Sequence, residues 1–320
     1  MVAKINVKPK VSICIPAYKQ TELLGKCIDS ILIQDYTDYE IVITDDTPDN
    51  SVLEFLKSKK LNDQLRYYKN PVSLGSPENW NCAVGKASGE YIKLLHHDDF
   101  FTHKDSLSKL VKALDDNPAS SFAFCATMVW NLRDNKKRIH RCSPKQLQRI
   151  KREPEFLFFR NMIGAPSVTI YRNEFNFRYD KRLTWFPDID FYIRALKQKP
   201  GIVMCNEALV CTADGAPGQV TQSVVHNKQI QIKEHLLVFE KLIHTVANKN
   251  KYTLFFDELF TRFEIKSISD IRQVCEVPPV LIDFFTAVFA QQNKKRLYKK
   301  FRNWFYGSRF NNQLFRLEKY

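Results

Sequence analysis

The sequence predicts an α/β fold, in which a mostly parallel sheet is flanked by helices, followed by a helical module. Short apolar runs typical of buried strands alternate with helical periodicity through about the first 130 residues. These runs become polar only at their C-terminal ends, as parallel strands buried on both faces do. After about residue 222 the pattern changes to long amphipathic helices. We therefore divide the chain into an α/β domain, 1–222, and a helical C-terminal module, 223–320.

The expected elements of the first 130 residues follow one another as strand and helix. Runs rich in Val, Ile, Leu and Tyr predict the strands, and apolar residues three and four positions apart predict the helices. The strands are 10–18, 39–46, 65–70, 90–97 and 120–130, and the helices are 22–34, 50–59, 76–87 and one that begins at Thr102.

Helices dominate the prediction for the rest of the chain. Residues 136–159 are basic and predicted to be helical, and "APSVTIYRN", 165–173, predicts one more strand. A helix is expected to start after Pro187 and to end at Gly201, since proline favours the first turn and glycine the end of a helix. Two long helices are predicted over the ranges 227–249 and 252–268.

Composition limits the class of protein. Lys and Arg number 49 against 35 Asp and Glu, which gives a net charge of +14 and a surface that attracts phosphates, nucleic acid or acidic lipid. The eight cysteines lie mostly in apolar runs without a CxxC pair, which is typical of reduced core residues in a cytosolic protein. We find no signal peptide and no apolar run long enough to span a membrane.

Three predicted strands end on polar residues. These ends are 16–18, the acid pair at 45 and 46, and "HHDD" at 96–99. Because ligands bind outside the carboxyl ends of parallel strands, we expect a binding site at this edge. The turn after the first strand lacks GxGxxG, which argues against hydride transfer with NAD. Asp45 suits a nucleotide base or ribose hydroxyl, but a helix-capping network in "DDTPDNSVL" explains it equally well.

The "HHDD" block is the more specific signal. If it continued the strand, His96 and Asp98 would share one face, and His97 and Asp99 the other. That arrangement disfavours a tetrahedral zinc site. One carboxylate at the edge suits Mg²⁺ or Mn²⁺, which take most of their ligands from substrate phosphates and water. Solvated turn residues that cap the next helix are the alternative.

Four segments in this order carry a resemblance to a known family: "VSICIPAY", "YEIVITDDTPDNS", "NPVSLGSPENWNCAVGKASGEYIKLLHHDD" and "WFPDIDFYIRAL". Over about residues 10–222 the chain resembles the inverting family 2 glycosyltransferases with the Rossmann-like GT-A fold. The resemblance implies transfer of a sugar from a nucleotide-diphosphate sugar, such as a UDP- or GDP-sugar, to a hydroxyl of a glycan or lipid-linked glycan. Many resembling enzymes act in bacterial surface polysaccharide synthesis, as of O-antigen or capsule.

The resemblance also assigns roles to residues. The DxD motif of the family falls on His96, His97 and Asp98, so that His96 faces the ribose and Asp98 binds Mn²⁺ or Mg²⁺. Asp99 is then expected to support the loop. The other donor-binding residues carried over are Pro16, Ala17, Tyr18, Asp45 and Asn79.

The catalytic base implied by the resemblance is Asp188. One carboxylate is enough, because inversion is a single displacement in which the acceptor hydroxyl loses its proton. Asp190 points about 200° away on a helix, so its role is structural or acceptor-supporting, and a salt bridge with Arg194 is the simpler explanation. Trp185 is predicted either to stack on an acceptor sugar or to lie in the core.

One departure from the family lies in "CTADGAPGQVTQS". Asp214 and Ala216 stand where many relatives have an arginine and a histidine. Either another residue supplies the missing contact to metal or diphosphate, or metal dependence is weaker, or turnover has been lost.

The segment 294–320 mixes Lys and Arg with aromatic residues. Such a segment can lie in an anionic membrane interface, which predicts a cytoplasmic enzyme in peripheral contact with the inner face of the membrane; packing on its own module is the alternative. A nucleic-acid-binding protein is disfavoured, since no helix-turn-helix, zinc-finger or RNP signature is present. A non-catalytic member that binds sugar nucleotide or glycan stays open, as does homo-oligomerisation.

Overall fold

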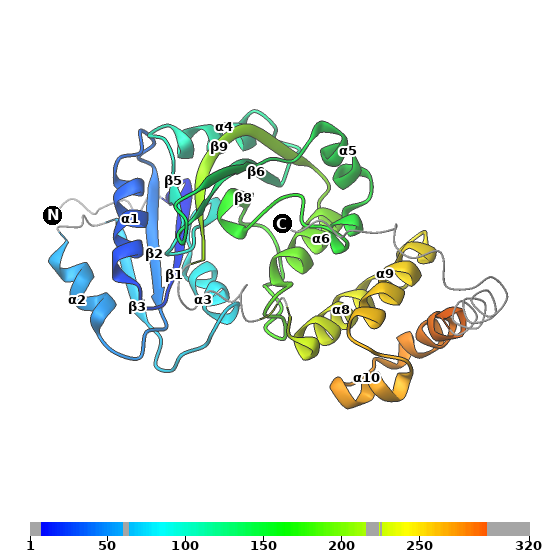
Figure 1. Cartoon of the computed structure of the whole chain (residues 1–320). Coiled ribbons are helices and arrows are strands. Elements are labelled where there is room, and N and C mark those ends of the chain that lie inside the picture. Colours follow the sequence, from blue (N-terminus) through cyan, green and yellow to red (C-terminus); the bar gives the residue numbers. More distant parts are fainter. Residues whose placement is uncertain (1–7, 60–63, 216–223, 225, 293–320) are drawn as a thin grey trace. The chain divides into compact units, whose positions relative to one another are not determined.

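The computed structural model describes residues 8–59, 64–215, 224 and 226–292. The chain divides into two compact units, Met1–Glu234 and His235–Tyr320, and each is described by itself. The first unit contains the sheet and the second is helical (Figure 1). The predicted domain boundary after residue 222 lies outside the described residues and stays a prediction.

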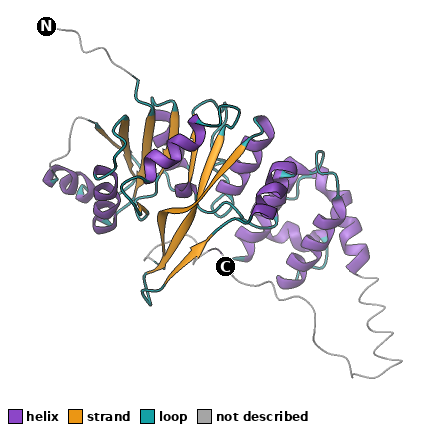
Figure 2. Cartoon of the chain, turned by 90° about the horizontal axis from the view of Figure 1, so that it is seen from above, coloured by secondary structure: helices purple, strands orange, loops and turns teal. Residues whose placement is uncertain are grey.

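A single mixed sheet forms the centre of the first unit. In the part of the chain that the structure describes, its strands are ordered β3-β2-β1-β4-β8-β6-β9-β5, and β7 pairs with β6. Figure 2 shows these strands from above, with helices on the flanks of the sheet. The strands are β1 Val11–Ala17, β2 Tyr39–Asp45, β3 Leu65–Lys69, β4 Tyr91–Leu94, β5 Phe100–Phe101, β6 Phe122–Asn131, β7 Lys137–His140, β8 Thr169–Arg172 and β9 Ile202–Asp214.

The first four strands of that order are parallel, as the sequence predicts. Ala17 of β1 pairs with Asp45 of β2, and Cys14 of β1 pairs with Leu94 of β4. Every residue of β1 and β2 is buried, which explains their continuous apolar character. The three polar strand ends therefore meet at one edge. Beyond β4 the sheet is mixed, because β8 is antiparallel to both β4 and β6 while β9 is parallel to β6.

The helices of the first unit bury one apolar stripe each. In α1 the buried residues include Leu24, Cys27, Ile28 and Ile31, which recur with helical spacing. The last helix of the set, predicted to start after Pro187 and to end at Gly201, begins at Pro187 and ends earlier than predicted, at Gln198. The helices are α1 Thr21–Leu32, α2 Ser51–Ser58, α3 Glu78–Lys86, α4 Ser106–Asp115, α5 Pro144–Arg152 and α6 Pro187–Gln198, with short 3₁₀ turns η1 Pro154–Phe158 and η2 Pro166–Val168.

The prediction that the fourth strand runs over 90–97 is wrong at its end. β4 stops at Leu94, and residues 97 and 98 form a turn. Leu95 still donates its N–H to the backbone of β1, but the N–H of His96 donates to the hydroxyl of Ser167 at 3.0 Å. The "HHDD" block is therefore a turn, and its side chains do not alternate between two faces.

The prediction of a helical segment over 136–159 is only partly right. Lys137–His140 form β7, which extends β6 as an antiparallel hairpin, before α5 begins. Ile139 in this strand is 53% exposed, so the apolar signal of a buried strand is missing from the sequence. The long strand β9 also escaped prediction, because more than half of its residues are exposed or only partly buried.

The second unit is helical, as predicted, and is built around aromatic side chains. Phe239 stacks on Tyr252 with ring centroids 4.7 Å apart, and Phe256 and Phe260 are fully buried. Its elements are the rest of α8 Lys228–Leu242, α9 Lys249–Arg262, α10 Ile268–Val274, η3 Pro279–Leu281 and a helix over 282–292.

Three predictions from composition have different outcomes. All eight cysteines are free thiols and most are buried. No helix among the described residues has the length and apolarity needed to cross a membrane. The basic aromatic segment 294–320 lies outside the described residues, so its contact with a membrane stays a prediction.

Candidate active site at the strand ends

Asp45 lies at the end of β2 with no exposed surface, and both oxygens of its carboxylate accept hydrogen bonds. One oxygen accepts the N–H of Thr47 at 2.8 Å, and the other accepts from the hydroxyl of Tyr67 at 2.7 Å and from Lys69 Nζ at 3.0 Å. A carboxylate held by several donors fixes the loop that follows it. These contacts hold the turn that follows β2 in place. The donor-binding role of Asp45 stays a prediction.

Asp46 and Asn79 connect the same loops. Asp46 accepts from the side chain of Asn70 at 2.6 Å and from the backbone N–H groups of Leu74 and Gly75 at 3.0 and 2.7 Å. Asn79 Nδ2 lies 3.3 Å from the carbonyl of Ala17, which ends β1. Asn79 is 4% exposed, so its amide links strand ends, and its predicted donor contact is untested.

The first strand ends in residues of different exposure. Pro16 and Ala17 are buried, whereas Tyr18 is 42% exposed at the edge. The carbonyl of Pro16 lies 3.1 Å from Nδ1 of His97, which ties the end of β1 to the "HHDD" turn. The described structure thus brings two of the predicted donor-binding segments into direct contact.

The "HHDD" turn gathers three potential metal ligands. His96, Asp98 and Asp99 each offer one potential ligand atom, and these three atoms lie within 4.8 Å of one another. The expectation that Asp98 and Asp99 face opposite sides is therefore wrong, because it assumed strand geometry. Asp99 is 3% exposed and accepts the N–H of Ala213 at 3.1 Å, so it also supports the loop.

The electrostatics of this turn suit a cation. Burial, with the nearby charge of Asp98, raises the pKa of Asp99 well above its usual range. Burial also lowers the pKa of His96 to about 4, so its ring is neutral near pH 7 and has a lone pair for a metal. The two carboxylates are ligands that Mn²⁺ and Mg²⁺ prefer, and the neutral imidazole is a third potential donor.

Two neighbours of the turn were not found from the sequence. The ring of Trp80, on α3, lies 4.7 Å from the ring of His96 and 5.2 Å from that of Tyr179. Lys93 is fully buried beneath the turn and donates to the carbonyl of Ser167, and burial lowers its pKa to about 8. The sequence signal for this neighbour was a lysine, Lys93, within an otherwise apolar strand.

Asp188 is the second residue of α6 and is partly buried. Its Oδ1 accepts the N–H of Ile189 at 2.8 Å, and its Oδ2 accepts from Nδ2 of Asn161 at 3.0 Å. Burial raises the pKa of Asp188 to about 7, which outweighs the lowering effect of these two donors. A carboxylate with this pKa exchanges a proton readily at neutral pH.

Asn161 is held so that its amide nitrogen faces Asp188. Its oxygen accepts the N–H groups of Ile163 and Gly164 at 3.1 and 2.8 Å, and its Nδ2 also donates to the carbonyl of Gly164 at 3.1 Å. Gly164 has φ of 115°, a conformation that glycine adopts without strain. The sequence "NMIG" offered a turn signal but no indication of its partner.

The other residues predicted near the base have structural contacts. Asp190 is 2% exposed and accepts two bonds from the guanidinium of Arg194, at 2.6 and 2.9 Å, so the expected salt bridge is present. Trp185 is half-buried, and its backbone N–H donates to Glu234 at 2.7 Å. Whether either residue contacts an acceptor stays a prediction.

The departure at the end of β9 lies close to the "HHDD" turn. Ala213, whose N–H binds Asp99, directly precedes Asp214. The carboxylate of Asp214 adds negative charge near this turn, where the resemblance led us to expect a positively charged side chain. Ala216 lies outside the described residues.

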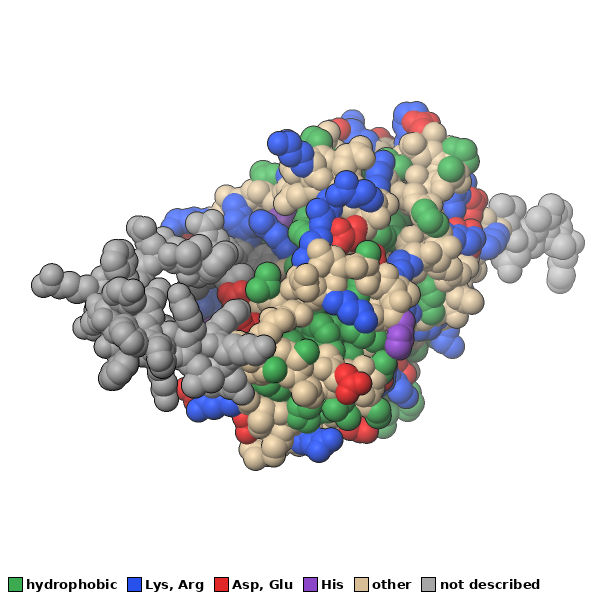
Figure 3. Space-filling model, turned by 90° about the vertical axis from the view of Figure 1, so that its right-hand side faces the viewer, with side chains coloured by type: hydrophobic (Ala, Val, Ile, Leu, Met, Phe, Trp, Pro, Cys, Tyr) green, Lys and Arg blue, Asp and Glu red, His purple; other side chains and the backbone are tan. Residues whose placement is uncertain are grey.

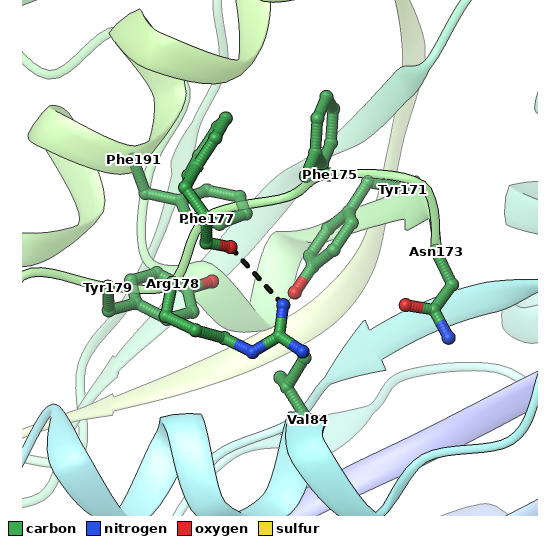
Figure 4. A pocket seen from close by; sticks show the side chains of 8 residues that line it. All are labelled: Val84, Tyr171, Asn173, Phe175, Phe177, Arg178, Tyr179 and Phe191. Carbon is green, nitrogen blue, oxygen red and sulfur yellow. Dashed lines mark hydrogen bonds between the residues drawn. The ribbon is translucent and has the colours of Figure 1, made fainter.

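Aromatic rings pack against the inner face of α6. Tyr179 stacks on Phe191 of α6 with centroids 4.3 Å apart, and Figure 4 shows Tyr171, Phe175 and Phe177 around the same small cavity. The cavity holds about 10 Å³, room for about one water molecule. These rings form core packing that fixes α6 and therefore Asp188.

An open groove lies along α5. It has a volume of about 540 Å³ and is lined by residues of α5 and by Phe156 and Met162, the neighbour of Asn161. Lys145 and Arg152 of α5 line it and have no carboxylate within ion-pair distance among the described residues, whereas Arg149 pairs with Glu153 at 2.7 Å. The groove is thus lined by the apolar side chains of Phe156 and Met162 together with the cationic side chains of Lys145 and Arg152.

Comparisons with known proteins agree with this architecture. The model of Glycosyl transferase family 2 matches residues 12–195, more than half of the chain. The uncharacterized glycosyltransferase MJ1057 of Methanocaldococcus jannaschii is 28% identical over 59% of this chain and 65% of its own length. The GalNAc(5)-diNAcBac-PP-undecaprenol β-1,3-glucosyltransferase of Campylobacter jejuni is 31% identical over 37% of this chain and 38% of its own length.

Solved structures share the fold. S. aureus TarS 1-349 in complex with UDP-GlcNAc has a TM-score of 0.60 at 16% identity, with 79% of this chain and 72% of that chain covered. The mannosyltransferase PcManGT from Pyrobaculum calidifontis, in complex with GDP-Man and Mn²⁺, has a TM-score of 0.54 at 16% identity, with 94% and 84% covered. These likenesses show the GT-A fold. Since the family model covers most of the α/β unit, the chain belongs to glycosyltransferase family 2.

Proposed function

We propose that this enzyme transfers a sugar, with inversion, from a nucleotide-diphosphate sugar to a hydroxyl of a glycan or lipid-linked glycan. Asp188 takes the proton of the acceptor hydroxyl, and the acceptor oxygen forms a bond to the anomeric carbon. The bond from that carbon to the diphosphate breaks, and the nucleoside diphosphate leaves with the electron pair. The proton then passes from Asp188 to solvent.

One observation carries this proposal. The partly buried carboxylate of Asp188, at the start of α6, has a pKa raised to about 7 and is held in one orientation by a hydrogen bond from Asn161. A general base works best when its pKa lies near the operating pH. The donation from Asn161 leaves the carboxylate oriented by the protein rather than by solvent. Asp188 is thus suited to accept a proton from a hydroxyl placed beside it.

The donor's diphosphate is proposed to lie at the "HHDD" turn. Asp98, Asp99 and His96 would hold a divalent cation there, and the cation would stabilise the negative charge of the departing diphosphate. Support comes from the complexes of TarS with UDP-GlcNAc and of PcManGT with GDP-Man and Mn²⁺. Tyr18, exposed at the end of β1, is available to contact the nucleotide.

The acceptor is proposed to lie in the groove beside α5. Its apolar lining and the cations Lys145 and Arg152 suit an acceptor that carries phosphate next to apolar groups. A relative from Campylobacter jejuni is named as acting on a PP-undecaprenol substrate. We therefore place the reaction in surface polysaccharide synthesis at the inner face of the cell membrane.

The nucleic-acid alternative gains no support from the face shown in Figure 3. On the face shown in Figure 3, Lys and Arg side chains lie in several separate groups with hydrophobic side chains between them. A nucleic-acid site instead needs a continuous basic patch or stripe.

The test is release of UDP, GDP or CMP from a panel of sugar nucleotides, with Mn²⁺ or EDTA, by wild type and D188N. We expect metal-dependent release from one donor class, lost in D188N and kept in D116N, which removes an exposed acid by the same chemical change. If no donor is hydrolysed and calorimetry detects no sugar-nucleotide binding, the proposal is wrong and the non-catalytic alternative is favoured.

A further inference from the structure

Glu234, on α8, binds the backbone in front of α6. Its carboxylate accepts three N–H groups, from Thr184 at 2.6 Å, Trp185 at 2.7 Å and Phe186 at 2.9 Å. Glu234 is only 2% exposed. Three backbone donors on one buried carboxylate fix both the path of the chain and the position of the charge.

The bound backbone leads directly into the candidate base. Phe186 is the residue that caps α6, and Asp188 follows two positions later. Glu234 lies 46 residues after Asp188 in sequence and outside residues 12–195, which match the family model. The contact therefore comes from a part of the chain that the family comparison does not cover.

We propose that Glu234 is a positioning residue for Asp188, which it orients through the 184–186 backbone and near which it places a second buried carboxylate. The inference rests on the proposed role of Asp188 as base. A like charge nearby disfavours ionisation of a carboxylate. Consistent with this, Glu234 contributes to the raised pKa of Asp188, after burial as the main cause, and burial raises the pKa of Glu234 itself.

Other charged and titratable groups around Asp188 act differently. Asn161 donates to the carboxylate and lowers its pKa, and the charge of Lys233 lowers the pKa of Glu234. Other groups in this region include Tyr179 and Tyr192, whose pKa values are raised, the ion pair of Asp190 with Arg194, and His140 beside Gly164, whose pKa is lowered by burial. Glu234 is thus the carboxylate that acts on Asp188 from outside α6.

Two substitutions separate charge from geometry. E234Q removes the charge and keeps a side chain of the same length with one oxygen that accepts N–H groups. E234D keeps the charge but withdraws it by one methylene, which weakens the hold on the 184–186 backbone. E240Q makes the same chemical change as E234Q at a partly exposed position of α8 and is the matched control.

The first readout is the titration of Asp188 itself, followed by ¹³C NMR of aspartate-labelled protein and assigned by its loss in D188N. We expect a midpoint near pH 7 in wild type and E240Q, and a lower midpoint in E234Q. Folding of each variant is checked by circular dichroism. An unchanged midpoint in folded E234Q would overturn the electrostatic part of the proposal.

The second readout is the pH dependence of nucleotide release. The low-pH limb should move to lower pH in E234Q, whereas E234D should keep the wild-type limb and lose about 10- to 100-fold in kcat through misplacement of the base. Wild-type kcat in E234D would contradict the positioning role. If wild type releases no nucleotide but the NMR midpoint shifts as expected, the proposed function fails while the effect of Glu234 on Asp188 stands.

Discussion

Two carboxylate sites in the α/β unit use the same amino acid in opposite ways. Asp45 and Asp46 end a buried strand, and side-chain and backbone donors contact both of their carboxylates. Asp188 starts a helix, has two recorded donors and lies near a second carboxylate, Glu234. The carboxylates of the first site anchor loops through their hydrogen bonds, whereas burial at the second site raises the pKa of Asp188.

This difference teaches how to separate a scaffold acid from a reactive one. A carboxylate whose oxygens accept several hydrogen bonds from neighbouring loops holds those loops in place. A carboxylate that is desolvated and under-bonded is costly to ionise, and proteins keep such groups where a proton must move. The comparison predicts that the two sites respond oppositely to substitution.

The largest expected effect is on turnover at the second site. D188N should reduce kcat by about 10² to 10⁴, the usual contribution of a general base, because an amide cannot accept the acceptor's proton. Donor affinity measured by calorimetry should stay near wild type. Turnover within twofold of wild type would remove Asp188 from the base position and break the comparison.

The first site should respond in stability. D46A leaves the side chain of Asn70 and the N–H groups of Leu74 and Gly75 without their acceptor in a buried place. We expect a loss of about 3–5 kcal/mol in the free energy of unfolding, measured by urea denaturation. D116N, at an exposed acid, should change it by less than about 0.5 kcal/mol. A stable but inactive D46A would instead assign Asp46 to ligand binding.

A third effect has the opposite sign. The native pKa of Asp188 is about 7, above the usual 3.8, so the folded state holds a proton between these pH values that the unfolded state has released. Stability therefore falls as pH rises through this window, and D188N should be more stable than wild type at pH 8 but not below pH 4. The gain is at most about 4 kcal/mol, and less because Asp188 is only partly buried. Thermal melts at both pH values test this; an equal gain at both would contradict it.

Substitution of Asn161 tests the second site from the side of the donor to Asp188. N161A removes the donor that lowers the pKa of Asp188, so the low-pH limb of activity should move upward, opposite to E234Q. Loss of orientation should also reduce kcat by about tenfold or more. N117A, which removes an exposed asparagine that donates to the carbonyl of Ala113, should leave both quantities unchanged. A limb that moves downward would contradict the assigned contact.

The smallest effect is expected in the groove. The charge reversals K145E and R152E should raise KM for a phosphate-bearing acceptor several-fold, since exposed ion pairs contribute about 1 kcal/mol or less each. The KM for the donor should stay the same. A change in donor KM alone would place the nucleotide, rather than the acceptor, near α5.

Sequence patterns gave much of the fold and some of the site. Continuous apolar runs predicted β1 and β2, and helical spacing with Pro187 predicted the start of α6. They missed β7 and most of β9, where exposure interrupts the apolar pattern. At the "HHDD" block the assumption of strand geometry separated Asp98 from Asp99, and the turn brought them together.

By itself the sequence predicted the alternation of strand and helix from β1 to β4 and the polar strand ends, because these follow from local hydrophobic periodicity, whereas the candidate base came from motifs that resemble a known family. Only the tertiary structure decided what surrounds Asp188. Asn161 and Glu234 lie 27 and 46 residues away along the chain and reach it through loops and a helix. Burial and neighbouring charge set the pKa of a carboxylate, and both depend on contacts that no local pattern encodes.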